Sequence, residues 1–313
     1  MESQPNALHL SRRDVFALGA AAIGSIPLRA ADDQSFQITA GESTIDVTFA
    51  PADFDLRPPA IIGWISTAAR AVSAYFGKFP VASESVRVRA IADRAGVLGG
   101  TTYGQGPRTI MRVGQHVTSG QLDRDWTMTH EFLHLGFPSM PPQHNWIEEG
   151  IAVYAEPIAR AQIGADTAQQ AWGGMVRDMH QGQPGPGDRG LDVTHTWGRT
   201  YWGGAIFCLL ADIQIRERTA NRLGLQHALR GVLAAGGTIE YDWSIEDAFA
   251  AGDAAVKALV LTELYNQMKD KPVTTDLDQL WKRLGVEPVN SGVVFHADAP
   301  LAAIREAITK PLG

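Results

Sequence analysis

The feature that most restricts the fold of this 313-residue chain is the segment TMTHEFLH at residues 127–134. It places His130 and His134 four residues apart, with Glu131 directly after the first histidine. In an α-helix, positions i and i+4 lie on one face, one turn apart. Two imidazoles at this spacing can bind one zinc ion, and Glu131 can then reach a water molecule on the ion without being a ligand itself. The segment therefore predicts a helix that forms one wall of a zinc site.

A catalytic zinc ion needs a third protein ligand and an open fourth position. The segment WIEEG at residues 146–150 opens a second predicted helix, after a turn rich in Gly and Pro. This helix can run back against the first, so we predict Glu149 as the third ligand, with Glu148 and His144 as alternatives. Glu156 lies two turns after Glu149, and we predict that it accepts a hydrogen bond from a ligand histidine. The alternative for Glu156 is a solvated helix charge.

The composition agrees with a globular enzyme and excludes several other classes. The chain is 45% hydrophobic and 19% charged, which is typical of folded domains. Its net charge of −7 argues against a broad nucleic-acid surface, which needs clustered Lys and Arg. The single cysteine, Cys208, excludes an internal disulfide and a zinc site built from several cysteines. Histidine and carboxylate side chains are left as the predicted zinc ligands.

The N-terminus has the layout of an export signal. A twin-arginine pair stands in SRRDVF at residues 11–16, an apolar stretch continues to residue 28, and Ala30-Ala31 offers a cleavage point. The apolar stretch is short and interrupted by Gly and Pro, so a membrane-spanning helix is not predicted there. We expect residues 1–30 to be removed, and the mature protein to be periplasmic or extracellular with no integral membrane segment.

Hydrophobic patterning predicts strands first and helices afterwards, an α+β arrangement. Residues 35–50 alternate as a strand or hairpin, 59–76 have helical spacing, and 85–91 and 109–113 alternate as strands, while the glycine-rich stretch 96–106 indicates a loop or an irregular edge. Further helices are predicted over 119–136, 146–163, 201–216, 219–235, 244–251, 253–269, 276–284 and 299–309. We predict a catalytic domain over 31–215 and a mainly helical C-terminal subdomain over 216–313.

Three segments resemble the gluzincin zinc metallopeptidases of the peptidase MA-like superfamily, in particular the aminopeptidase N-like and glycyl-aminopeptidase-like branch. They are HEFLH at 130–134, WIEEGIAVYAE at 146–156 and YWGGA at 201–205. The resemblance covers about residues 60–215. It implies a thermolysin-like zincin domain, in which a small mixed sheet packs with the HExxH helix and the glutamate helix.

The resemblance also implies roles for individual residues. One zinc ion would be bound by His130, His134 and Glu149, because the family's zinc-binding glutamate stands just before a glycine. Glu131 would act as general base, and Tyr201, in the family's Y-x-x-G motif, would stabilise the oxyanion. The expected function is hydrolysis of peptide bonds in a peptide or protein substrate. The alternatives are a zinc hydrolase acting on another amide or an ester, and an inactive, peptidase-derived binding protein.

Two features depart from the family pattern. Fourteen residues separate His134 from Glu149, whereas the common gluzincin gap is 18. The family's exopeptidases also carry a glutamate on a glycine-rich strand that grips the free amine of the substrate, and the segment 96–114 contains no glutamate. The choice between endo- and exopeptidase therefore stays open. Predicted substrate contacts are Tyr103, Trp197 and Arg199.

Overall fold

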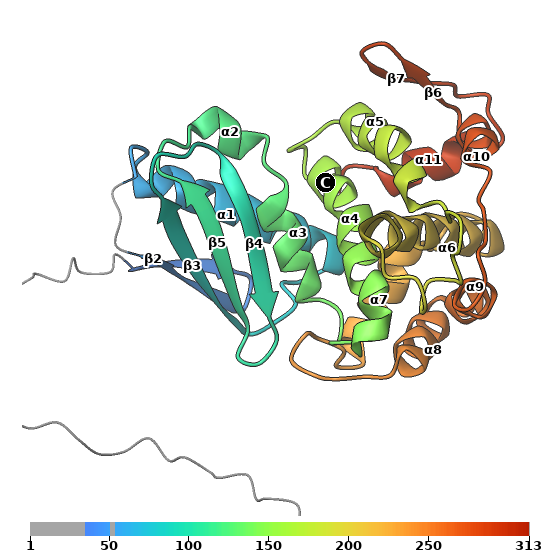
Figure 1. Ribbon diagram of the computed structural model, residues 1–313, viewed down its shortest axis with the longest axis horizontal. Helices are drawn as coiled ribbons and strands as arrows, with labels where there is room; N and C mark the ends of the chain where they lie inside the picture. Colours follow the sequence, from blue (N-terminus) through green and yellow to red (C-terminus); the bar gives the residue numbers. More distant parts are fainter. Residues whose placement is uncertain (1–34, 51–53, 313) are drawn as a thin grey trace, which may run out of the picture. The chain divides into compact units, whose positions relative to one another are not determined.

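The structure is a computed structural model that describes residues 35–50 and 54–312, all within one compact unit (Figure 1). The predicted signal over residues 1–30 lies outside the described residues. Within the described ranges, every helix is too short or too polar to cross a membrane.

A five-stranded mixed sheet forms one side of this unit (Figure 1). The central strands β2, β3 and β5 are parallel, while β1 and β4 pair antiparallel at the two edges. Across the sheet, the strands follow the order β1 (Ser35–Ala40), β2 (Ser43–Phe49), β3 (Ser83–Ile91), β5 (Arg108–Gly114) and β4 (Val97–Tyr103). The predicted strands and the predicted α+β class are confirmed.

One face of the sheet is covered by helices and the other is exposed. In β3, Val86 and Val88 are fully buried, whereas Arg87 and Arg89 point outward, as the strict alternation predicts. The buried face packs against α1 (Pro58–Phe76) and α3 (Thr127–His134), which lie behind and beside the sheet in Figure 1. This packing presses the HExxH helix against the sheet.

Strand β4 occupies the stretch for which a loop or an irregular edge was expected. It is an edge strand, and its register shifts between Val97 and Gly99. The irregular edge is thus confirmed, while the loop alternative is wrong for residues 97–103. Gly100 pairs with Met111 in β5, which brings the glycine-rich backbone over the helix that carries the histidines.

The helix predicted over 119–136 is two helices, α2 (Ser119–Asp123) and α3. The side chain of Thr118 caps α2. Asp125 then accepts hydrogen bonds from the main-chain N–H and the hydroxyl of Thr127, the first residue of α3. Helix α4 (Asn145–Gln162) follows where the second helix of the zinc site was predicted.

The C-terminal half is helical, as predicted. It contains a π-helical turn (Arg199–Gly203), α6 (Gly204–Arg218), α7 (Leu225–Ala234), α8 (Ile245–Val256), α9 (Val260–Met268), α10 (Leu277–Leu284) and α11 (Ala302–Ile308). Helix α5 (Ala168–Asp178) and a hairpin of β6 (Val286–Val289) and β7 (Gly292–Phe295) were not predicted. The domain boundary predicted between residues 215 and 216 falls inside α6, and the division into two domains stays a prediction.

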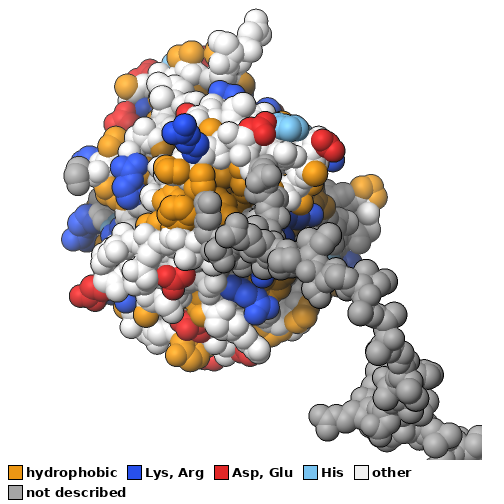
Figure 2. Space-filling view, turned by 90° about the vertical axis from the view of Figure 1, so that its left-hand side faces the viewer, with side chains coloured by type: hydrophobic (Ala, Val, Ile, Leu, Met, Phe, Trp, Pro, Cys, Tyr) orange, Lys and Arg blue, Asp and Glu red, His pale blue; other side chains and the backbone are white. Residues whose placement is uncertain are grey.

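Figure 2 shows the face at the sheet end of the described unit. Hydrophobic side chains gather near its centre, with Lys and Arg side chains around them. The partly buried Phe36 and Ile38 belong to β1, which is an edge strand of the sheet within the described residues.

Candidate metal centre

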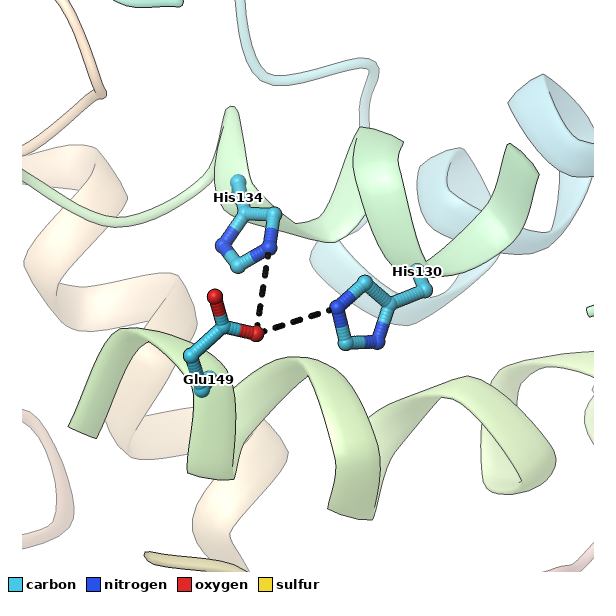
Figure 3. A group of neighbouring side chains, drawn as sticks. All are labelled: His130, His134 and Glu149. Carbon is cyan, nitrogen blue, oxygen red and sulfur yellow. Dashed lines mark hydrogen bonds and ion pairs between the residues drawn. The ribbon is translucent and has the colours of Figure 1, made fainter. Parts of the chain in front are cut away.

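Three side chains from two helices converge on one point (Figure 3). His130 and His134 project from α3, and Glu149 projects from the second turn of α4. Glu149 Oε2 lies 3.2 Å from His130 Nε2 and 3.8 Å from His134 Nε2. All three ligand atoms lie within 4.8 Å of one another. This is the pair of imidazoles and the carboxylate that the sequence predicted to share an ion.

The donor set fits zinc in type and in spacing. Zinc takes four tetrahedral ligands, and His₂Glu with one open position is a known catalytic set. With bonds of about 2.0–2.2 Å, two ligand atoms of a tetrahedral ion lie about 3.3–3.6 Å apart. The distances of 3.2 and 3.8 Å lie close to that range. Small side-chain movements are enough to form the site.

The surroundings favour the protonation states that a zinc ion requires. Burial lowers the pKa of His134 to about 4, so this imidazole is neutral at pH 7. Burial alone would raise the pKa of Glu149, but above all the hydrogen bond with His130 holds it below its ordinary value. A neutral imidazole and an ionised carboxylate are both ready to coordinate a metal.

Glu131 lies beside the three donors on the side of β4. Its carboxylate oxygen Oε2 accepts a hydrogen bond of 2.8 Å from the hydroxyl of Thr102. Burial raises the pKa of Glu131 above its ordinary value. The strand passes so close that a Cβ atom on Gly100 would lie 2.6 Å from Glu131 Cγ and 2.8 Å from Cδ. Gly100 is therefore the residue that lets the sheet edge approach this carboxylate.

The close approach gives a testable prediction. In Gly100→Ala the added methyl group must displace Glu131 or the strand, so we expect about 1–3 kcal/mol of lost stability and a clear loss of any activity that depends on Glu131. Thermal unfolding and a turnover assay measure the two effects. Gly63→Ala is the matched control, because a Cβ there meets nothing within 4 Å. Equal behaviour of the two variants would contradict the argument.

Tyr201 lies on the π-helical turn, across the site from Glu131. Its ring lies parallel to that of His130, with centroids 6.5 Å apart. Burial, together with the neighbouring Glu149 carboxylate, raises the pKa of Tyr201 to about 12. The phenol therefore keeps its proton at neutral pH and can donate it in a hydrogen bond. Trp197 stacks on Tyr201 with centroids 5.6 Å apart and is 60% exposed, so it lies at the rim of the site.

Two glycines explain why Glu149 and Tyr201 lie so close together. Gly150 directly follows Glu149, and a Cβ on it would lie 2.4 Å from the carbonyl carbon of Gly204. A Cβ on Gly204 would lie 2.0 Å from the main-chain oxygen of Trp146. The two helices α4 and α6 therefore touch backbone to backbone at these positions. The glycines of the E-G and Y-x-x-G patterns serve one and the same contact.

A turn connects His134 to the helix that carries Glu149, across the gap that is shorter than in the family. Main-chain hydrogen bonds to residues of the C-terminal half stabilise this turn. The main-chain N–H of Ile239 donates to the carbonyl of Leu135, and the N–H of Ser139 donates to the carbonyl of Tyr241. Ile239 and Tyr241 belong to the loop between α7 and α8. That loop therefore closes one end of the site.

Neither alternative third ligand joins the group of donors. His144 Nδ1 lies 2.9 Å from Asp192 Oδ1, and the same carboxylate accepts hydrogen bonds from Trp146 and Tyr265. Glu148 lines the cavity beside the donors but is not one of the three. Burial, with the nearby charge of Glu149, raises the pKa of Glu148 to about 8.

The structure places three of the predicted site residues away from the donors and the cavity. Glu156 does not reach a histidine; its carboxylate lies 3.2 Å from Nε of Arg160, four residues further along α4. Arg199 is 3% exposed and lies 2.8 Å from Asp188, so it is a buried structural residue with no access to a substrate. Tyr103 packs against Arg108, its cross-strand partner, and does not line the cavity. For Tyr103 the reason is strand alternation, because its neighbour Thr102 takes the face toward α3.

The site opens into a cavity of about 350 Å³. Its walls come from β4, α3, α4, the π-helical turn and the loop after α7; they include Gly100, Thr101, Thr102, Asn145, Glu148, Tyr201 and Ile239. Sequence reasoning did not find Thr102, Asn145 or Ile239. The glycine-rich stretch was the only signal for Thr102, and nothing near Ile239 in the sequence points to the site.

Two solved structures with a similar fold are an aminopeptidase N family protein and a variant of an M1 zinc metallopeptidase. No protein-family model matches the chain, and no curated protein matches it in sequence. An aminopeptidase N family protein from Idiomarina loihiensis is 12% identical, with a TM-score of 0.62, over 82% of this chain and 49% of that protein. A variant of an M1 zinc metallopeptidase from Deinococcus radiodurans, bound to the substrate Tyr-Ser-Ala, is 15% identical with a TM-score of 0.50. That match covers 77% of this chain and 53% of that protein.

The chain thus spans about half the length of the structures it matches. At these identities the likeness concerns the fold, and it agrees with the gluzincin resemblance found in the sequence. Over 77–82% of its length, this chain is similar in fold to about half of each of these two structures.

Proposed function

We propose that this protein is a zinc-dependent peptidase in which His130, His134 and Glu149 bind one zinc ion. The observation that carries the proposal is the convergence of these donors within 4.8 Å, next to a carboxylate and a phenol that face the same cavity. The similarity in fold to an M1 zinc metallopeptidase supports it.

In the proposed reaction, each residue has a role that follows from its chemistry. Zinc, when bound, lowers the pKa of a water molecule and polarises the substrate carbonyl. Glu131 takes the proton of the attacking water and passes it to the leaving amine. Tyr201, which keeps its proton at neutral pH, donates a hydrogen bond to the oxyanion that develops on the carbonyl. The free edge of β4 offers main-chain groups to an extended peptide.

The proposal includes export. The twin-arginine pattern before residue 30 would deliver the folded protein to the periplasm or the outside of the cell, where peptides or proteins are its substrates. Detection of the mature N-terminus after secretion tests this part, and a mature chain that still begins at Met1 would contradict it.

Digestion of a complex peptide mixture by the zinc-loaded protein tests the activity. We expect new peptide termini in the mass spectrum, and their positions will distinguish endo- from exopeptidase cleavage. A chelator should abolish the cleavage, and added zinc should restore it. If the zinc-loaded protein cleaves no peptide in the mixture, the proposal is wrong.

Zinc should also stabilise the fold. A ligand that binds only the folded state adds about 2.7 kcal/mol when its free concentration is 100 times its Kd. We therefore expect the midpoint of thermal unfolding to rise when zinc is added to the metal-free protein. The double variant His130→Ala/His134→Ala should show no such rise, and an equal rise in that variant would place the zinc elsewhere.

A further inference from the structure

A row of hydrogen-bonded side chains crosses the sheet and ends on Glu131. Glu84 on β3, Thr109 on β5 and Thr102 on β4 belong to three adjacent strands and all face the buried side. Thr109 Oγ1 lies 2.8 Å from Glu84 Oε1 and 3.0 Å from Thr102 Oγ1. Thr102 Oγ1 lies 2.8 Å from Glu131 Oε2. Sequence patterning gave no role to any of the three.

The inner end of this row is the buried carboxyl group of Glu84. Glu84 is 2% exposed, Thr109 is fully buried, and Oε2 of Glu84 has no hydrogen-bond partner among the described residues. Burial raises the pKa of Glu84 to about 8, so this carboxyl holds a proton at neutral pH. Thr109 donates a hydrogen bond to Glu84 Oε1, and Thr102 donates one to Glu131 Oε2. The 3.0 Å contact between the two hydroxyls joins these bonds into one row.

The outer end of the row lies within hydrogen-bond distance of two oxygens of Glu131. The hydroxyl of Thr102 lies 2.8 Å from the carboxylate and also 3.1 Å from the main-chain oxygen of Glu131. Gly100 packs under the same side chain, at a distance that admits no Cβ. A glutamate side chain has three rotatable bonds, so these contacts remove freedom that the carboxylate would otherwise have. One oxygen is engaged by Thr102 and the other is left for the cavity.

We propose that Thr102 is a positioning residue, whose hydroxyl, backed by Thr109 and Glu84, fixes the carboxylate of Glu131 for proton transfer. The proposal rests on the proposed function, because it assigns Thr102 a part in that reaction. Thr102 acts through Glu131 and need not touch the substrate. A general base that is already in its reactive position does not have to reorganise during the reaction. The rate is therefore higher than with a mobile carboxylate.

The test uses the zinc-loaded full chain and the pair Thr102→Val and Thr102→Ser. Valine keeps the shape of threonine and removes the hydroxyl, while serine keeps the hydroxyl. For Thr102→Val we expect kcat to fall about 10- to 100-fold, the size typical of partners that orient a reactive group, with KM and zinc content unchanged. Thr102→Ser should restore kcat to within about threefold of the parent. Thr39→Val, on the exposed side of β1, is the control for a threonine-to-valine change in a strand.

Thr109→Val extends the test by one link. This variant keeps the contact between Thr102 and Glu131 but removes the hydrogen bond between Thr109 and Thr102. We therefore expect kcat to fall less than in Thr102→Val. Crystal structures of zinc-loaded Thr102→Val and Thr102→Ser give a readout that needs no turnover. The Glu131 carboxylate should leave its place in the valine variant and keep it in the serine variant.

The outcomes separate this proposal from the proposed function. If Glu131→Gln loses activity while Thr102→Val keeps the parental kcat, the peptidase assignment stands and the role of Thr102 is wrong. If the parent shows no peptidase activity, the proposed function fails. The crystal structures still decide the role of Thr102, and an unmoved Glu131 carboxylate in Thr102→Val overturns it.

Discussion

Replacing Glu131 with Gln should leave zinc bound and lower kcat by about 10²- to 10⁴-fold, the usual contribution of a general acid–base group. The amide has nearly the same size and can still accept the hydrogen bond of Thr102, so the packing against Gly100 is preserved. It cannot take a proton from the attacking water at neutral pH. The expected change is therefore in kcat, measured on a peptide that the digestion experiment identifies.

A companion variant separates the base from the ligands. Glu149→Gln removes the carboxylate that lies 3.2 Å from His130, so the protein should lose zinc affinity together with activity. Elemental analysis of the two purified proteins then gives full zinc in Glu131→Gln and reduced zinc in Glu149→Gln. Glu42→Gln, at an exposed turn, controls for the chemical change itself. Parental turnover in Glu131→Gln would remove this residue from the mechanism.

The two histidines of the site could be predicted from the sequence because they lie on one helix. The spacing of His130 and His134 depends only on the geometry of α3, and any chain that forms this helix brings the two imidazoles to one face. Glu149 required one further step, the assumption that α4 runs back against α3. The structure brings the three side chains together. The glycine after Glu149 has a different part, because it lets α6 touch α4 and so brings Tyr201 close to Glu149.

The part that failed depends on tertiary contacts. Glu156 lies on the expected helix, but its carboxylate forms an ion pair with Arg160, one turn further along. Arg199 stands two residues before Tyr201, yet the π-helical turn directs it into the protein toward Asp188. The hydroxyl of Thr102 gained its role only when β4 paired with β5. Hydrophobic periodicity carries no information on which polar side chains meet across elements.

Replacing Asp212 with Asn should lower the free energy of unfolding by about 3–5 kcal/mol, the cost of leaving a buried partner charge uncompensated. Asp212 lies on α6 and pairs with Arg216 at 2.7 Å, and both side chains are at most 5% exposed. The same carboxylate accepts hydrogen bonds from the phenol of Tyr154 on α4 and from the main-chain N–H of Leu225 on α7. The variant leaves Arg216 buried without its counter-charge.

The matched control is an ion pair of the same kind at the surface. Glu217 pairs with Arg283 at 2.9 Å, but the two side chains are 41% and 46% exposed. Glu217→Gln should therefore change stability by no more than about 1 kcal/mol. Denaturant unfolding followed by circular dichroism measures both variants, and equal losses would contradict the argument from burial.

The shape of the unfolding curve bears on the predicted boundary at residue 215. Asp212 connects α4, which carries Glu149, with α6 and α7, so the helices on both sides of that boundary share one buried network. We therefore expect one cooperative transition in the parent, with tryptophan fluorescence and circular dichroism coinciding. In Asp212→Asn the whole transition should move to lower denaturant, and zinc affinity should weaken near that midpoint. Two separate transitions in the parent would instead favour a C-terminal subdomain that folds independently.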